Sequence, residues 1–343
     1  TEMLQFHPTG LLVGKSIATG GLLEEGLRGA GARLFNGNGE RYMERYDPKG
    51  ERATRDVVSR SSYMEVMAGR GSTHGGVWID ATHLGEEYLL ENFPGMVARC
   101  RDNGFDLLHE RVEVSPSAHY QMGGVYIDTE CRTTLPGLFA AGEDAAGVHG
   151  ANRLGGNGVA DSIVFGAYSG DVMSQSLPAH VPVPAESLIQ EMCARWMAPL
   201  RRPKGERPSQ LRREIENLMW EKVGVVRNGS DLESALDSLQ EIRERAEQQS
   251  ANPALAFNLE WNEALDVTNI CLNAELVARG ALIRTESRGS HFRSDFPKAD
   301  PAWLKRIWLQ RRGDATDVRF LPVSFHRLAP PDLPVAPLTR SGT

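Results

Sequence analysis

The chain has 343 residues, 41% of them hydrophobic and 24% charged, which is enough for two or three globular modules with ordinary cores. Its formal net charge of -7 offers no basic surface of the kind that neutralises nucleic-acid phosphates, so we expect no nucleic-acid partner. The four cysteines lie far apart, which disfavours a zinc or iron–sulfur site and indicates free thiols in a reducing compartment.

Neither a membrane span nor a signal segment is predicted. No apolar run approaches the roughly 20 residues that cross a bilayer, and no charged-then-apolar segment opens the chain. We expect a cytoplasmic protein, peripheral at the inner face of the cytoplasmic membrane if partner subunits hold it there. The sequence begins with the apolar segment TEMLQFHPTG and has no initiator methionine, so we interpret it as cut from a longer sequence.

Residues 1–115 predict a mixed α+β module. Strand-like pieces such as GVWID at 76–80 occur with a helical stretch at 56–68 and with many glycines.

From 116 to 176 the pattern changes to strand, glycine turn and helix. GGVYID at 123–128 and LFAA at 138–141 predict strands. The helix that follows carries an apolar face made of Val159, Ile163, Val164 and Ala167. This order is the usual frame of a nucleotide-type cofactor site. The proline-rich stretch 177–186 predicts a linker.

The region 187–300 predicts a helical domain of three helices. The first carries apolar residues across 211–219, and Ser230 is the expected cap of the second. The third is apolar on two sides over 265–277 and is expected to end at Gly280. Residues 301–343 predict a C-terminal segment, and its end at 327–343 predicts a mobile tail.

The stretch HGANRLGGNGVAD at 149–161 sets one cation, Arg153, among four glycines. Glycines let another molecule approach the backbone closely, and an arginine fork binds a carboxylate or phosphate with two parallel hydrogen bonds. This stretch therefore predicts a ligand with an acidic group.

Nine motifs in chain order resemble the flavoprotein subunit of succinate dehydrogenase and fumarate reductase. They are QFHPTG (5–10), EEGLRGAGA (24–32), GERYMERYDP (39–48), TRDVVSR (54–60), VWIDATHLG (77–85), SAHYQMGGV (117–125), GLFAAGEDA (137–145), HGANRLGGN (149–157) and RTESRGSHFRSDFP (284–297). Any one could arise by chance, whereas nine in order make the resemblance specific.

The resemblance implies an FAD-dependent oxidoreductase that transfers a hydride between flavin N5 and a four-carbon dicarboxylate, succinate or fumarate. The implied fold class is α/β plus α+β. Residues 1–115 would form a capping domain, 116–176 the returning part of a Rossmann-like FAD-binding domain, 187–300 a helical domain and 301–343 the C-terminal segment. The GxGxxG unit of the family is not in this sequence. We therefore expect an N-terminal FAD-binding half outside this sequence, which is either a truncated fragment or one piece of a split enzyme, and an iron–sulfur electron-transfer subunit as partner.

By the same resemblance, His7, His119 and Arg153 hold the substrate carboxylates. Arg55 matches the family's proton shuttle. An arginine is a poor general acid at its usual pKa of about 12 or more, so it needs a relay that replaces its proton. Glu25 and Arg28, three residues apart and able to share a helix face, match that relay.

Glu143, which follows Gly142, matches the acid that accepts hydrogen bonds from FAD hydroxyls. The helix expected to begin near Gly156 would direct its positive end at the flavin, and Asn157 and Gly158 would add backbone contacts.

Each of these residues alone has an ordinary structural explanation. A lone histidine is more often structural, a Glu–Arg pair at this spacing is a common helix-face ion pair, and a lone glutamate is a common N-cap. The occurrence of all of them inside matched motifs favours function. His74, His83, His109, His149 and His291 stay unassigned, and we expect the segment around His291 to dock the helical domain near the site entrance.

Three positions depart from the family pattern. Glu24 stands where a threonine usually helps hold a substrate carboxylate, Gly158 replaces a serine and Ala30 replaces a glutamate. An anion at position 24 would repel a dianion unless it points away or Thr19 takes over its role.

Two alternatives stay open. L-aspartate oxidase shares the frame, but resembling sequences read NRLASN and SRGLHYxxDYP where this chain has NRLGGN and SRGSHFRSDFP, which favours succinate. The other alternative is a truncated, non-catalytic subunit that keeps a docking surface. Whether FAD is covalently attached, and whether oxidation or reduction runs in the cell, is open at this stage.

Overall fold

The computed structural model describes residues 1–14, 19–177, 183–313 and 315–325, so the predicted tail at 327–343 and the middle of the predicted linker lie outside the described residues. The N-terminal elements are β1 (Leu4–Leu11), α1 (Glu25–Gly29), β2 (Arg33–Phe35), α2 (Arg55–Glu65), β3 (Val77–Asp80), α3 (Glu86–Asn92), α4 (Pro94–Asp102) and β4 (Val112–Gln121). The later elements are α5 (Asn157–Gln175), α6 (Glu186–Arg201), α7 (Pro208–Val223), α8 (Gly229–Ala246), α9 (Leu259–Ile283), β5 (Lys305–Arg312) and β6 (Ala315–Pro322). Short 3-10 helices lie at Met43–Arg45, Gly50–Arg52, Thr82–Leu84, Gly142–Asp144 and Pro301–Trp303, and a π-helical turn lies at Val66–Arg70.

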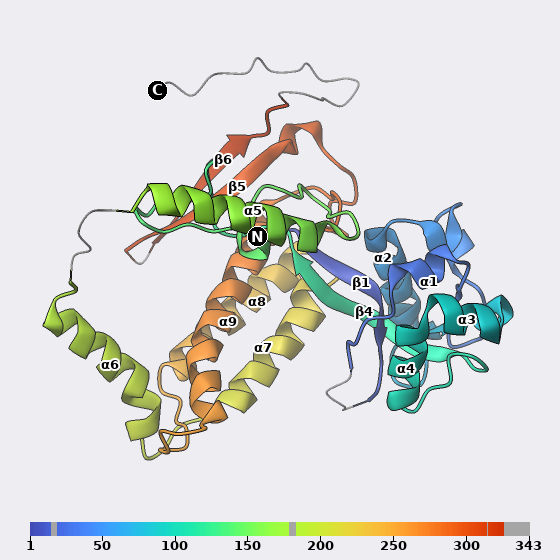
Figure 1. Cartoon of the computed structure of the whole chain (residues 1–343), viewed down its shortest axis with the longest axis horizontal. Helices are drawn as coiled ribbons and strands as arrows, with labels where there is room; N and C mark the ends of the chain where they lie inside the picture. Colours follow the sequence, from blue (N-terminus) through green and yellow to red (C-terminus); the bar gives the residue numbers. More distant parts are fainter. Residues whose placement is uncertain (15–18, 178–182, 314, 326–343) are drawn as a thin grey trace.

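These elements form three groups (Figure 1). One lobe holds α1 to α4, a second group is the bundle of α7, α8 and α9, and the third is the layer of α5 and the β5–β6 hairpin. Strands β1 and β4 run side by side from the lobe toward the other two groups. The long strand pair therefore joins the lobe to the rest of the molecule.

The sheet of the lobe has the order β1-β4-β3-β2, and its neighbouring strands are antiparallel. The β1–β4 ladder runs from Leu4 opposite Gln121 to Leu11 opposite Val114, with register shifts after Gln5 and after His7. Such irregularities redirect side chains next to functional sites. Because β4 continues to Gln121, the predicted domain boundary at residue 115 falls inside a strand.

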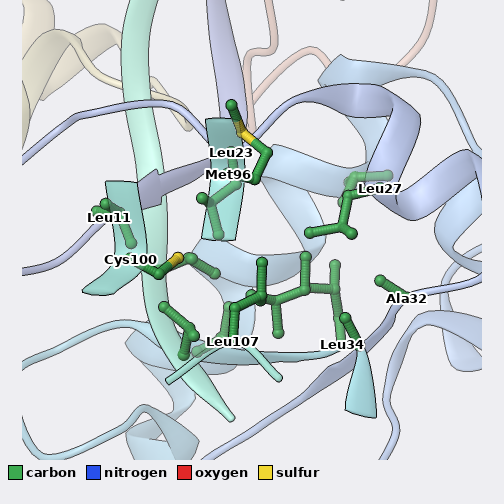
Figure 2. Close-up of a cluster of buried hydrophobic side chains, with 14 of the residues drawn as sticks. Leu11, Leu23, Leu27, Ala32, Leu34, Met96, Cys100 and Leu107 are labelled. Atoms are coloured by element: carbon green, nitrogen blue, oxygen red, sulfur yellow. The ribbon is translucent and has the colours of Figure 1, made fainter. Parts of the chain in front are cut away.

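The core of the lobe lies between this sheet and its helices. Figure 2 shows its side chains meeting from β1, α1, β2 and α4, among them Leu11, Leu27, Leu34, Met96 and Cys100. The helix predicted at 56–68 is α2, which ends at Glu65 and passes into the π-helical turn, where Gly69 has a φ of 73°.

The helical region holds four helices among its described residues, not the three that we predicted. The additional helix is α6, whose apolar residues Leu188, Met192 and Trp196 recur every four positions and could have indicated it. The cap of α8 is Asn228, not Ser230, because the Asn228 side chain accepts the Asp231 N–H.

Gly280 does not end the third predicted helix. Helix α9 continues to Ile283, and Gly280 is buried within it. A Cβ at residue 280 would lie 3.1 Å from Thr1 Oγ1 and 3.3 Å from Glu2 Oε2. A close approach between segments therefore explains this glycine, not a cap.

The strands expected at 123–128 and 138–141 are not formed. Isolated bridges join Val125 to Ala145 and Arg132 to Phe139, but the described residues provide no neighbouring strand that would extend either bridge into a ladder. The helix expected next is α5, and its N-cap is Gly156, as predicted. The predicted apolar face of α5 is exposed, with Val159, Ile163 and Val164 at 69%, 67% and 60%.

The C-terminal segment contains a hairpin that the sequence did not reveal. β5 pairs with β6 from Lys305 opposite Pro322 to Arg312 opposite Ala315. The Trp308 ring stacks on Tyr126 at a centroid distance of 4.5 Å, which anchors the hairpin to the segment that follows β4. Within the part of the chain that the structure describes, no helix is both long and apolar enough to cross a membrane.

Candidate active site

The structure brings the six predicted catalytic and substrate-binding residues together where β1, β4, α1, α2 and the loop before α5 meet. His7 comes from β1, His119 from β4, Glu25 and Arg28 from α1, and Arg55 is the first residue of α2. Arg153 lies in the loop before α5.

Arg55 is held by two acceptors. Its Nε and Nη2 lie 2.9 and 2.8 Å from Glu25 Oε2, and its Nη1 donates to Gln5 Oε1 at 3.1 Å. The second Glu25 oxygen lies 3.5 Å from Arg28 Nη2. Glu25 therefore links the two guanidinium groups, in the order that a proton relay to Arg55 requires.

Arg28 is an almost fully buried cation. Its Nη1 donates to the Glu51 backbone oxygen at 2.6 Å, while its Nε and Nη2 make no hydrogen bond with the described residues. Burial lowers the pKa of Arg28 from its ordinary value. A guanidinium whose proton is held less tightly is better suited to pass a proton through Glu25.

Arg153 is 7% exposed and is held by three neighbours. Its Nη2 donates to Gln5 Oε1 at 3.0 Å and lies 2.8 Å from His119 Nε2. Its guanidinium carbon sits 4.3 Å from the centre of the Tyr120 ring. Because a guanidinium only donates, His119 Nε2 is the acceptor and the ring is neutral.

The two histidines pack together, with ring centroids 5.3 Å apart. Burial, followed by the charges of Arg153 and Arg55, lowers the pKa of His119 to about 4. Burial and the charge of Arg55 lower the pKa of His7 to about 2. Two neutral imidazoles beside two guanidinium groups form a cluster of donors suited to carboxylates.

Gln5 is a site residue that the sequence reasoning missed. It is fully buried, its Oε1 accepts from both Arg55 and Arg153, and its Nε2 donates to Asn152 Oδ1 at 2.7 Å and to the Arg153 oxygen at 2.8 Å. Its position two residues before His7 on a strand, inside the QFHPTG motif, was the available signal.

Glu24 is the exposed N-cap residue of α1. Thr19 does not take its place in the site, because the Thr19 hydroxyl donates to the Gly14 oxygen and accepts the Val13 N–H within its own loop. The expectation that Thr19 could replace the family threonine is therefore wrong.

Of the predicted cofactor residues, Glu143 lines a cavity, whereas Gly156, Asn157 and Gly158 lie at the N-terminus of α5. Glu143 and the backbone of Gly123 and Gly124 line a cavity of about 1140 Å³, and Glu143 Oε1 accepts the Gln121 N–H at 2.9 Å. Gly142, with a φ of 74°, packs against α5, since its Cβ would lie 2.9 Å from Ser162 Oγ. A carboxylate at the edge of such a cavity suits the hydroxyl groups of a flavin nucleotide.

The second feature is the N-terminus of α5. Gly156 has a φ of 80°, Asn157 is the first helical residue, and no side chain caps the helix. A Cβ at Gly155 would lie 3.0 Å from Glu25 Oε2 and 3.3 Å from Arg55 Nη2, so this turn lies directly on the relay. A helix N-terminus without a side-chain cap among the described residues, together with its positive end, suits an electron-rich ring, and this arrangement fits FAD.

A steric contact also explains why residue 158 is a glycine. A Cβ at this residue would lie 2.7 Å from Tyr120 Cε2. The glycine that replaces the family serine therefore admits the Tyr120 ring.

The segment 284–297 docks the helical domain onto the site, as expected. The Ser290 N–H and hydroxyl both donate to the Ala151 oxygen, at 3.0 and 3.1 Å, two residues before Arg153. His291 is fully buried with its Nδ1 2.9 Å from Arg227 Nη1. Burial and the Arg227 charge lower the pKa of His291 to about 3.

The comparisons with known proteins agree with this architecture. Residues 1–159 match the family described as FAD binding domain, and residues 212–341 match the family described as fumarate reductase flavoprotein C-term. The chain is 44% identical over 311 residues to a fumarate reductase (CoM/CoB) subunit of Methanothermobacter marburgensis, covering 91% of this chain and 56% of that protein.

Two further relatives define the breadth of the match. The chain is 34% identical over 326 residues to an L-aspartate oxidase of Synechocystis, covering 88% of this chain and 56% of that protein. It superimposes on E. coli quinol fumarate reductase FrdA with a TM-score of 0.82 at 31% identity, covering 96% of this chain and 60% of that one. The chain spans a little over half the length of these relatives. It belongs to the flavoprotein family of succinate dehydrogenases and fumarate reductases, and it carries part of an FAD-binding domain and the C-terminal helical region of that family.

Proposed function

We propose that the protein containing this chain interconverts succinate and fumarate with FAD. The observation that carries the proposal is the contact series Arg55–Glu25–Arg28 beside the donors His7, His119 and Arg153. Family membership supports FAD-dependent oxidoreduction, and the site residues support a dicarboxylate substrate.

Substrate binding uses the donors of this cluster. Arg153 is the cationic anchor for one carboxylate: its Nε has no hydrogen-bond partner among the described residues, while its Nη2 already donates to Gln5 and His119. His119 and His7, neutral at physiological pH because burial lowers the pKa of each ring, contribute one ring N–H apiece. A dianion therefore meets cationic and neutral donors, while the Glu24 carboxylate is exposed.

When bound, FAD supplies a hydride to fumarate or accepts one from succinate. In the reductive direction Arg55 donates a proton to the alkene carbon next to the one that receives the hydride, so that fumarate plus hydride plus proton gives succinate. Glu25, in contact with Arg55, then returns a proton to it, and Arg28 supplies Glu25. In the oxidative direction the same proton leaves through Arg55 and Glu25.

Gln5 keeps the two guanidinium groups apart and oriented. Its single oxygen accepts from both Arg55 and Arg153, so the proton shuttle and the carboxylate anchor share one fixed point. This sharing holds two like charges at a defined spacing around the substrate.

An L-aspartate oxidase is the second candidate, because several relatives bear that name. The NRLGGN and SRGSHFRSDFP segments favour a dicarboxylate without an amino group. We further infer a peripheral place at the membrane and, as the electron partner, an iron–sulfur subunit.

The test is an anaerobic titration of the full-length, FAD-loaded protein, following the visible flavin absorbance. Bleaching by succinate, with little by L-aspartate, is the expected result. Bleaching by L-aspartate alone would assign the second candidate, and no bleaching by either would support a non-catalytic subunit.

A further inference from the structure

A buried polar cluster of Tyr120, His149 and Asp161 borders the site and has no part in the chemistry above. The Tyr120 hydroxyl lies 3.1 Å from His149 Nε2, and the same nitrogen lies 3.1 Å from Asp161 Oδ2. The His149 and Asp161 side chains are 7% and 2% exposed. A carboxylate can only accept, so the hydrogen on Nε2 serves Asp161 and is shared with the Tyr120 oxygen.

The cluster fixes the ring on which Arg153 rests. The Arg153 guanidinium lies 4.3 Å from the Tyr120 ring centre, an arrangement in which the cation is attracted to the aromatic face. The His149 ring meets Tyr120 edge-on at 5.2 Å. From helix α5, Gly158 leaves no room for even one methyl group beside this ring. Tyr120 is therefore in contact with neighbours on more than one side.

The position of the cluster in the chain supports the same role. His149 and Asp161 are the two ends of the stretch HGANRLGGNGVAD that carries Arg153, and their contact closes this stretch into a loop. Asp161 lies on α5, so the loop is tied to a rigid helix. One Asp161 oxygen has no hydrogen-bond partner among the described residues. Packing therefore keeps the Asp161 side chain in place although its hydrogen bonding is incomplete.

We infer that Tyr120 is the positioning residue that orients Arg153, and that the His149–Asp161 pair and Gly158 hold Tyr120 in place. The inference rests on the proposed function, since Arg153 is oriented toward a dicarboxylate. Burial and the Asp161 charge raise the pKa of Tyr120, so its hydroxyl keeps its proton at neutral pH.

The test uses the full-length, FAD-loaded protein and malonate, a dicarboxylate that cannot be oxidised to an alkene. Tyr120→Phe keeps the ring and removes the hydroxyl, so the malonate Kd and the succinate KM should rise roughly three- to tenfold, with kcat within about twofold. Gly158→Ala displaces the ring from the other side and should weaken binding similarly. Tyr88→Phe, at an exposed ring of α3, is the matched control and should change neither value.

A double variant tests whether the residues act as one unit. Asp161→Asn should weaken malonate binding as Tyr120→Phe does. The double variant, which carries both substitutions, should bind malonate no less tightly than the single variant with the lower affinity. Unchanged malonate binding in both Tyr120→Phe and Gly158→Ala would overturn the inference and leave the proposed function standing. A wild-type protein that binds neither malonate nor succinate would overturn both.

Discussion

The three nitrogens of Arg55 are divided between two acceptors, and this distribution predicts which kinetic parameter Arg55 controls. Nε and Nη2 meet Glu25 and Nη1 meets Gln5, so the group is placed to exchange protons more than to grip a carboxylate. Arg55→Lys keeps the charge but shortens the donor. We expect kcat to fall by roughly 100-fold or more, while the malonate Kd changes little.

Steady-state kinetics gives kcat, and a malonate titration of the same preparation gives Kd. Arg52→Lys, at an exposed arginine three residues earlier, is the control and should leave both values unchanged. An Arg55→Lys variant with wild-type kcat would remove Arg55 from proton transfer.

His119 should couple dicarboxylate binding to proton uptake. Its pKa in the free protein is lowered to about 4, first by burial and then by the charges of Arg153 and Arg55, while Glu25 opposes them. A bound dianion favours the protonated ring, so its pKa rises in the complex. Because the complex then binds more protons than the free protein, affinity for the malonate dianion should increase as pH falls below neutral, as long as malonate itself stays a dianion.

Calorimetry of malonate binding in two buffers of different ionisation enthalpy measures the uptake. His119→Gln should bind malonate with less proton uptake than the wild type. Uptake that is unchanged in this variant would assign the proton to another group, with His7 next in line.

At the scale of the element, the contacts at the start of α8 show which of two candidate residues caps the helix. Asn228 Oδ1 accepts the Asp231 N–H at 3.0 Å, while the Ser230 hydroxyl only donates to the same Asn228 oxygen. Asn228→Ala should therefore lower the free energy of unfolding by about 1 kcal/mol. Ser230→Ala is the matched control and should cost less. Urea denaturation followed by circular dichroism compares the two, and a larger loss in Ser230→Ala would restore the cap that the sequence suggested.

Local sequence signals predicted those elements that local interactions determine. The strand at 77–80, the helix α2 and the start of α5 at Gly156 follow from apolar spacing and glycine placement. LFAA failed as a strand because a strand requires a neighbouring ladder, which the described residues do not provide. Gly280 failed as a cap because its cause is a contact with residues far away in the sequence.

The candidate site divides in the same way. Motifs identified the charged residues, whose chemistry is distinctive, and the structure brings them together. Gln5 was missed because an amide has no chemistry of its own here, and its role comes from two arginines 50 and 148 residues away. The Tyr120–His149–Asp161 cluster was missed because its contacts join β4 to the start of α5.

At the scale of the whole molecule, the site depends on contacts between groups of elements. The lobe contributes Glu25 and Arg55, the strand pair contributes Gln5 and His119, and the loop before α5 contributes Arg153. The helical domain contributes none of these, yet its segment at 288–292 contacts Ala151 beside Arg153. Docking of the helical domain should therefore influence substrate affinity from outside the site.

Gly289 offers the variant that tests this coupling. Its φ of 55° disfavours a side chain, and a Cβ there would collide with the Ala151 backbone oxygen, so Gly289→Ala has to displace the loop that carries Arg153. Gly313 has a φ of 60°, and no atom of the described residues lies within 4 Å of a Cβ there, so Gly313→Ala isolates the conformational penalty. That penalty is about 1–2 kcal/mol.

We expect Gly289→Ala to lower the thermal unfolding midpoint more than Gly313→Ala and to raise the succinate KM severalfold, because a displaced Arg153 no longer meets the carboxylate squarely. Gly313→Ala should leave KM unchanged. Thermal unfolding and steady-state kinetics on the two full-length proteins make the comparison. Equal KM values in the two variants would mean that Arg153 keeps its place without the helical domain, and Tyr120 and Gln5 would then be sufficient to hold it.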